Sequence, residues 1–242
     1  MSYTIPQTDP AEVIPQEFDL LDGAIRNGSL NHVSERCAQI CAAADVNPNG
    51  VAWAHLLVGT VAGVRGNHRE ALQEFQAAIE APRPLRPRVM AGVAKSFVML
   101  GRMAEAEAVV HTLLAEAPDS WHAWDACGVW QRERGDGEKA WESFAKAFSL
   151  HQQNGAVVSN LISLGFKSKR FAELVEILQQ HLMLEPLNFG FRGCLVNCLL
   201  STGDYEGACD QAQRIVLFAP FSTVPPELVA SMRDICQQFG RM

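Results

Sequence analysis

The sequence predicts an all-α fold, an α-solenoid of stacked antiparallel helical hairpins. The clearest signal lies in residues 121–150, where apolar residues recur at helical spacings of three and four along 121–134 and again along 137–150. Gly135 separates the two stretches, and glycine tolerates the left-handed backbone in which many helices end. One hairpin alone cannot bury both apolar stripes, so it has to stack on neighbouring copies of itself.

Near-copies of this hairpin recur at an interval of about 34 residues. Gly101 precedes Gly135 by one interval and Gly203 follows it by two. Small and aromatic residues follow the turn glycines, and proline recurs where each second helix should end; examples are Ala71, Phe75 and Ala78 after Gly66, and Pro118, Pro186 and Pro220. This pattern resembles the tetratricopeptide repeat family. The resemblance implies a superhelix of paired helices that binds other proteins.

The resemblance covers most of the chain as five units, 52–86, 87–120, 121–154, 155–188 and 189–222, which together make up the predicted domain 51–222. The fourth unit departs from the pattern, since Lys169 stands where glycine usually ends the first helix and Leu174 replaces an alanine. In the third unit, Trp130 stands where the family has a small residue. We expect Trp130 either to widen the spacing between helices or to help form a local pocket.

Both ends of the array are predicted to carry caps. Residues 1–16 contain three prolines and polar neighbours, and are expected to form a flexible acidic lead-in. Residues 17–50 have two apolar helical stripes and are predicted to be a degenerate capping hairpin that closes in a turn at residues 47–50. Residues 223–242 are predicted to be a C-terminal capping helix with one apolar face.

Composition and charge indicate which partners and which compartment to expect. The chain of 242 residues has a net charge of −7, and nucleic-acid-binding proteins usually present a basic face, so nucleic acid is not an expected partner. Its seven cysteines are odd in number and lie mostly on apolar stripes, which favours reduced thiols over a disulfide framework. No N-terminal leader and no apolar run of membrane-spanning length is evident, so we expect a cytoplasmic protein without membrane insertion.

The candidate chemical motifs are weak. Residues 45–50 imitate the opening of a calcium loop, but Leu56 stands where the loop needs a bidentate glutamate. The cysteine pairs 37/41 and 194/198 lack the two further ligands of a zinc site, and His55 and His181 occupy packing positions. No phosphate loop, nucleophile elbow or metalloprotease motif is present. We therefore predict no catalysis, no metal and no cofactor.

In tetratricopeptide repeat proteins the first helices line a concave groove that takes peptide segments. The resemblance implies that the partner-binding groove of this chain contains Trp53, Leu56, Arg88, Lys95, His122, Asp125, Val129, Arg132, Asn160, Phe166, Lys167 and Asn197. Its four cations outnumber Asp125 and the neighbouring Glu133, which suggests a partner with acidic groups or a free carboxylate. The alternative is that these charges are solvated and bind no dedicated ligand.

The predicted function is therefore a protein–protein interaction module that acts as an adaptor, scaffold or chaperone and binds a protein or peptide segment. A regulatory or accessory subunit of an enzyme, such as a glycosyltransferase, or of a secretion system is the alternative. The lysine–asparagine clamp of some family members is absent, and of the asparagine ladder of others only Asn160 is present. Assembly into a homo-oligomer stays open, as does binding of the acidic N-terminal segment in the chain's own groove.

Overall fold

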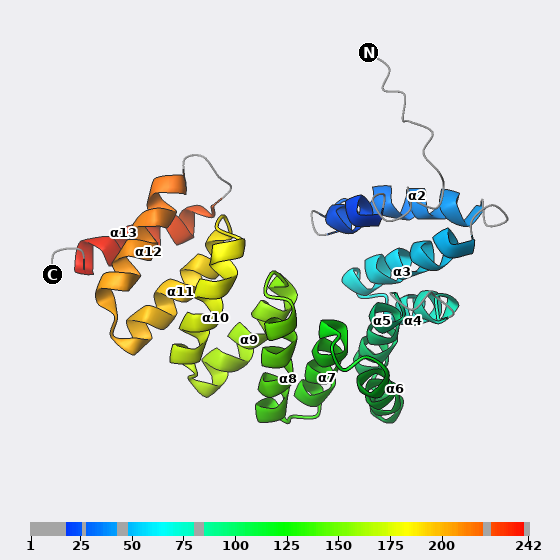
Figure 1. The fold of residues 1–242 in the computed structure, drawn as a ribbon. Coiled ribbons are helices and arrows are strands. Elements are labelled where there is room, and N and C mark those ends of the chain that lie inside the picture. The colour runs from blue at the N-terminus through cyan, green and yellow to red at the C-terminus, as the bar shows by residue number, and fades with distance from the viewer. Residues whose placement is uncertain (1–17, 26–27, 43–47, 80–84, 220–223, 240–242) are drawn as a thin grey trace, which may run out of the picture. The chain divides into compact units, whose positions relative to one another are not determined.

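The computed structural model describes residues 18–25, 28–42, 48–79, 85–219 and 224–239. Within these ranges every regular element is a helix and none is a strand, which confirms the predicted all-α class. Helices follow one another as hairpins with short turns (Figure 1). The expected lead-in, residues 1–16, lies outside the described residues.

The chain divides into two compact units, residues 1–135 and 136–242. The first unit contains a helical segment at 18–25 followed by α2 (Leu30–Ala42), α3 (Pro48–Val64), α4 (His68–Ala77), α5 (Arg86–Met99), α6 (Met103–Glu116) and α7 (Trp121–Glu133). The second contains α8 (Gly137–Leu150), α9 (Gly155–Ser168), α10 (Phe171–Leu184), α11 (Phe189–Thr202), α12 (Tyr205–Phe218) and α13 (Pro226–Phe239). Within each unit, helices that follow one another in sequence pack against each other.

Turns between successive helices have left-handed glycines at the positions that the repeat pattern predicts. Gly66, Gly101, Gly135 and Gly203 have φ values of +80°, +73°, +86° and +84°. In the fourth hairpin the same conformation falls on Lys169, with φ of 57°, directly after α9. A side chain with a Cβ pays a conformational cost there that glycine avoids.

Replacing Lys169 by glycine is therefore expected to stabilise the C-terminal unit by about 1 kcal/mol. Urea denaturation followed by circular dichroism measures this change. The matched control is Lys167→Gly, which places glycine inside the last turn of α9 and is expected to destabilise by about 1 kcal/mol. A loss of stability in Lys169→Gly would contradict the assigned cost of the left-handed lysine.

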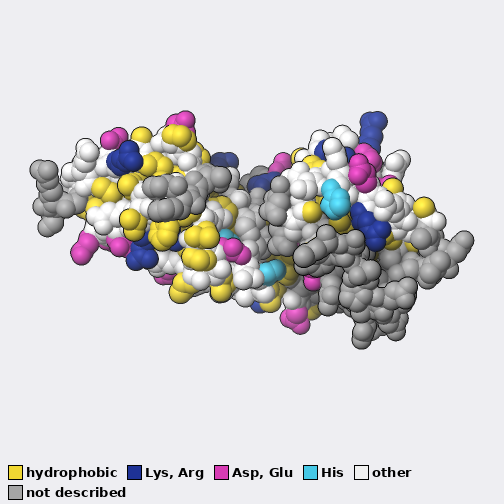
Figure 2. Space-filling model, turned by 90° about the horizontal axis from the view of Figure 1, so that it is seen from above, with side chains coloured by type: hydrophobic (Ala, Val, Ile, Leu, Met, Phe, Trp, Pro, Cys, Tyr) yellow, Lys and Arg dark blue, Asp and Glu magenta, His cyan; other side chains and the backbone are white. Residues whose placement is uncertain are grey.

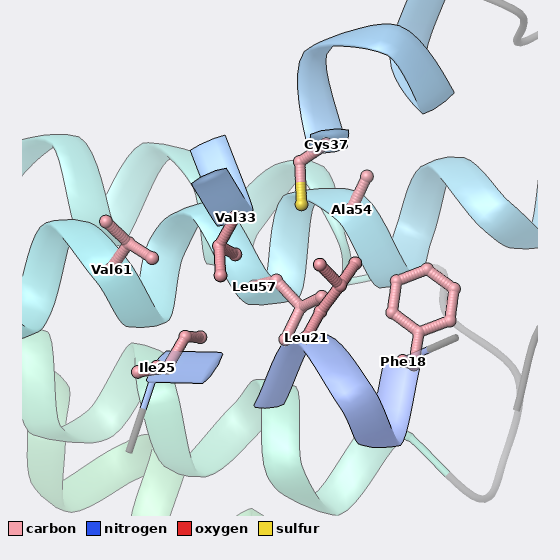
Figure 3. Packing of buried hydrophobic residues seen from close by; sticks show 8 residues of the cluster. All are labelled: Phe18, Leu21, Ile25, Val33, Cys37, Ala54, Leu57 and Val61. Carbon is pink, nitrogen blue, oxygen red and sulfur yellow. The ribbon is translucent and has the colours of Figure 1, made fainter. Parts of the chain in front are cut away.

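The N-terminal core joins segment 18–25 and α2 to α3 (Figure 3). Its buried residues are Phe18, Leu21, Ile25, Val33, Cys37, Ala54, Leu57 and Val61. Side chains from all three helices point into this cluster, so the first hairpin buries its apolar stripes against α3. Hydrophobic burial of this kind is what holds a terminal hairpin to a solenoid.

The start of α3 corrects one expectation. Residues 47–50 were expected to form a turn, with the first unit beginning at residue 52, whereas α3 begins at Pro48. Proline suits the first position of a helix, because its fixed φ is helical and the N–H it lacks would have had no partner there. The signal Asn-Pro-Asn-Gly, typical of turns, therefore marks a helix start.

Close packing in the hairpins depends on glycines that face large side chains. The Phe75 ring of α4 lies between Gly59 of α3 and Gly92 of α5, and a Cβ at either glycine would lie 2.8 Å from a ring carbon. In the second unit, Gly165 of α9 receives Leu174 of α10, whose Cδ1 would lie 2.7 Å from an added Cβ. The missing alanine at position 174 is thus compensated by a glycine on the facing helix.

Among the described residues, no helix combines the length and the apolar character that crossing a membrane requires.

Candidate functional site

All twelve predicted groove residues lie on the first helices of the hairpins. In the first unit, α3 carries Trp53 and Leu56, α5 carries Arg88 and Lys95, and α7 carries His122, Asp125, Val129 and Arg132. In the second unit, α9 carries Asn160, Phe166 and Lys167, and α11 carries Asn197. Each unit is therefore considered by itself as a candidate binding surface.

Three of these side chains are buried. Leu56 is 1% exposed, Asp125 is 2% exposed and Val129 is 8% exposed. Side chains buried to this extent offer almost no area to a partner, so the accessible part of the predicted groove excludes them. The burial of Asp125 is the most informative, because a carboxylate is rarely buried without a cation beside it.

The cation beside Asp125 is Lys95, whose Nζ donates a hydrogen bond to the buried carboxylate and joins α5 to α7. Removing either partner would leave the other charge poorly compensated, which destabilises a protein strongly when the remaining charge is buried. Lys95 is therefore a structural residue, and a substitution there would change folding along with any binding.

The N-terminal segment covers the beginning of the predicted groove. The Phe18 ring stacks on Trp53 with centroids 4.7 Å apart, and Asp22 forms an ion pair with Arg88. These contacts occupy two groove residues with the chain's own first helix. The related expectation, that the acidic residues 1–16 lie in the groove, falls outside the described residues.

Ion pairs within the chain reduce the positive charge that the predicted groove can offer to a partner. Arg132 forms an ion pair with Glu133 at 2.9 Å, in addition to the pairs of Arg88 and Lys95 with their own carboxylates. Of the four cations, Lys167 alone forms no ion pair within the described part of the chain, and it is exposed. Among the predicted groove cations, Lys167 on α9 is therefore the best placed to bind an acidic group of a partner.

The α9–α11 face, defined here by Asn160, Phe166, Lys167 and Asn197, keeps its predicted residues at the surface. Phe166 is 37% exposed and meets Phe171 edge-on, with ring centroids 5.5 Å apart. Lys167 and Asn197 are exposed, and Asn160 is half-buried. Both α9 and α11 pack against α10, so one helix supports them both. This face combines amides, one aromatic ring and one cation.

The tryptophans of residues 121–154 are engaged in packing. Trp130 is 7% exposed, with the Arg134 guanidinium 4.8 Å above its ring and His111 edge-on at 5.9 Å. The Nε1 of Trp124 donates a hydrogen bond to the Pro118 carbonyl at 2.7 Å. The large residue at position 130 thus fills core space between α6 and α7.

The histidines and cysteines that were considered as metal ligands are at least partly buried, and the histidines are bonded to other groups of the chain. His181 is buried and its Nδ1 lies 2.7 Å from the Gln152 carbonyl, while the Nδ1 of His55 lies 2.7 Å from Glu74. Burial raises the pKa of Cys194, and burial beside Cys194 raises the pKa of Cys198 to about 12. Within the described ranges no cluster of three or more histidine, cysteine or acidic side chains is arranged to hold a metal ion.

One surface feature was missed by the sequence analysis. Large apolar side chains are exposed on the second unit at the end of α10, in the turn that follows it, and at the end of α12 (Figure 2); they are Met183, Leu184, Leu187, Leu217 and Phe218. The Phe218 ring contacts Phe189, with centroids 6.3 Å apart. Exposed apolar groups of this size are typical of surfaces that bind other proteins. The repeat pattern gave no sign of them, because they lie at helix ends.

Comparison with known proteins agrees with this architecture. A family model described as tetratricopeptide repeat matches residues 65–127, which run from the turn after α3 into α7. No curated protein sequence matches the chain significantly.

Solved structures with the same fold are distant in sequence. Yeast Tom70 superposes with a TM-score of 0.65 at 14% identity, covering 84% of this chain and 43% of its own. PilW, a widely conserved type IV pilus biogenesis factor, gives 0.60 at 14% identity and covers 93% of this chain and 99% of its own. The structure of Naa15/Naa10 bound to HypK-THB gives 0.55 at 16% identity, covering 77% and 29%. The chain spans less than half of the first and third of these chains, and the likeness is one of fold.

Proposed function

Because the chain is a tetratricopeptide repeat protein, we propose that it is a protein–protein interaction module and that its α9–α11 face binds an extended segment of a partner protein. The observation that carries the proposal is that Phe166, Lys167 and Asn197 of this face are exposed, whereas the groove residues of the first unit are at least partly buried and several of them pair within the chain. In tetratricopeptide repeat proteins the first helices line the concave groove that takes peptide segments.

The amides of the face suit a peptide backbone. An asparagine side chain offers two N–H donors and a carbonyl acceptor, so the exposed Asn197 matches the alternating N–H and C=O groups of an extended segment, and the half-buried Asn160 adds a second amide on α9. The exposed Ser163, one helical turn from Asn160 on α9, adds a further hydroxyl. Backbone recognition of this kind binds a segment with little dependence on its sequence.

We propose that Phe166 and Lys167 determine which partner segment is bound. The half-exposed Phe166 ring provides an apolar contact, and aromatic residues are among those that contribute most to protein interfaces. The Lys167 ammonium attracts a carboxylate, either an acidic side chain or a chain terminus. We therefore propose a partner segment that carries an apolar residue next to an acidic one.

A module of this kind serves as an adaptor, scaffold or chaperone, and holds its partner without chemical change. The alternative role is that of a regulatory or accessory subunit of an enzyme or of a secretion system. We propose a cytoplasmic location, because seven cysteines, an odd number that lie mostly on apolar helical stripes, favour reduced thiols over a disulfide framework.

The test is affinity capture from a native lysate of the source cells, quantified by mass spectrometry, with wild-type protein beside Lys167→Glu. The charge reversal is expected to reduce the captured amount of the partner by on the order of tenfold, because an attractive ionic contact becomes a repulsive one. The fold should survive, since Lys167 is exposed and forms no ion pair among the described residues.

Lys146→Glu is the matched control. Lys146 is an exposed lysine on α8, a second helix of the same unit, and the same charge change there should leave capture unaltered. Equal capture by wild type and Lys167→Glu would reject the α9–α11 face. Equal loss in both variants would mean that net charge, and no particular site, governs binding.

A further inference from the structure

The terminal helices α12 and α13 pack against each other and run in opposite directions (Figure 1). The register is set by Tyr205, the first residue of α12, and Phe239, the last of α13, whose rings stack at 4.8 Å with planes 7° apart. One helical turn inward from each ring lie Cys209 on α12 and Cys236 on α13. The register therefore brings two cysteines of different helices opposite each other.

Both cysteines lie on the faces that the two helices press together. Cys209 is 6% exposed and belongs to the buried stripe of α12 with Ala208 and Ala212. Cys236 follows the buried Val229 and Met232 of α13 at helical spacing. Small residues along α12 let the helix backbones approach closely, as a disulfide requires. Burial and the nearby Cys209 thiol both raise the pKa of Cys236, so the two cysteines lie close enough to interact.

The other conspicuous cysteine pairs do not meet this condition. Cys37/Cys41 and Cys194/Cys198 each lie one turn apart on a single helix. Side chains at that spacing have Cβ atoms about 5–6 Å apart, whereas a disulfide needs about 3.5–4.5 Å. Either of these pairs would have to distort its helix to cross-link.

We propose that Cys209 and Cys236 form a reversible disulfide that fastens the terminal helix α13 to α12, with a low-molecular-weight disulfide such as oxidised glutathione as the oxidant. Cys236 reacts first, because it is half-buried while Cys209 is buried. Cys236 lines an open hollow of about 750 Å³ whose charged side chains are Asp210, Arg214 and Arg233. Asp210 forms an ion pair with Arg214, so Arg233 is the cation that attracts a carboxylate of glutathione.

The reaction balances in two exchanges. The Cys236 thiolate attacks one sulfur of oxidised glutathione, forms a mixed disulfide and releases one glutathione thiolate. The Cys209 thiolate then attacks the Cys236 sulfur and releases the second. Two protein thiols lose two electrons and two protons in total, and one oxidised glutathione becomes two reduced ones. Reduced glutathione in excess reverses both exchanges.

The rate at which Cys236 reacts with oxidised glutathione should rise with pH. Burial, together with the neighbouring Cys209, raises the pKa of Cys236, so its thiolate is scarce near neutral pH. Below that raised pKa the thiolate fraction, and with it the rate of the first exchange, increases about tenfold for each pH unit.

The test uses the full chain, reduced, freed of thiols and incubated with oxidised glutathione at pH 8. Free thiols are then blocked, and the protein is digested with trypsin and an endoprotease that cleaves after glutamate. Cleavage after Glu206 separates Cys209 from Cys194 and Cys198. The expected product is residues 207–214 linked to residues 234–241, with a mass lower by two hydrogen atoms than the sum of the peptides, and it disappears on reduction.

Cys236→Ser should abolish the linked peptide, and Cys194→Ser should retain it. A second readout is trypsin cleavage of the native protein after Arg233, an exposed residue of α13, which the disulfide should slow by on the order of tenfold because α13 opens less often. Accumulation of a stable mixed disulfide on Cys236 in the wild type, or recovery of both cysteines blocked and unlinked, would overturn the proposal.

Discussion

Ala140→Glu is expected to unfold the C-terminal unit. Ala140 is fully buried on the inner stripe of α8, together with Phe144 and Ala147. Glutamate at this position would carry a charge into the core or would have to be protonated, and either costs several kcal/mol. Such a cost is a large fraction of the stability of a domain of this size.

Thermal melting followed by circular dichroism measures the effect. We expect the variant to lose much of the helical signal of the second unit at 25 °C and to melt well below the wild type. Ala172→Glu is the control, because Ala172 is exposed in the first turn of α10, where a negative charge is neutral to favourable. An Ala140→Glu variant that melts like wild type would show that the inner face of α8 is assigned incorrectly.

The second large effect is expected at Gly59. An added Cβ would lie 2.8 Å from carbons of the Phe75 ring, which is itself held on its other side by Gly92. Because the ring cannot move away from both helices, we expect Gly59→Ala to destabilise the first unit by about 2–3 kcal/mol. Urea denaturation at constant m-value gives the difference in unfolding free energy.

Gly63→Ala supplies the control on the same helix. Gly63 lies one turn from Gly59 on α3, and a Cβ there would meet nothing within 4 Å. Alanine should therefore stabilise α3 by about 0.5–1 kcal/mol through the lower entropy of the unfolded chain. Changes of the same sign in both variants would contradict the close contact with Phe75. Gly59→Ala combined with Phe75→Leu should recover part of the lost stability.

The repeat pattern predicted the fold because its signals are local. A left-handed glycine at 66, 101, 135 and 203 ends a helix whatever lies around it, so the turns could be located from the sequence. Substitutions that compensate for each other on two facing helices could not be recognised from the sequence. Leu174 looked like a defect of the fourth unit, although Gly165 on α9 makes room for it. Pro48 looked like part of a turn, although it starts α3.

The site was less accessible to sequence reasoning for a similar reason. The repeat register assigns a residue to a first helix, but the contacts between helices decide whether that residue is exposed. Asp125 and Lys95 looked like opposite charges of an open groove, and instead they pair across α5 and α7 with the carboxylate buried. Trp53 and Arg88 looked accessible, and the segment 18–25 contacts both.

The central claim, that the α9–α11 face binds a partner segment, is tested most directly by photo-cross-linking. A benzophenone side chain placed at Ser163 on α9 or at Asn197 on α11 reacts only with what touches it, and Gln179, exposed on α10, is the control position. After irradiation in native lysate, we expect the same protein to be cross-linked from positions 163 and 197 and absent from 179. A partner cross-linked from position 179 but not from 163 or 197 would contradict the proposed site.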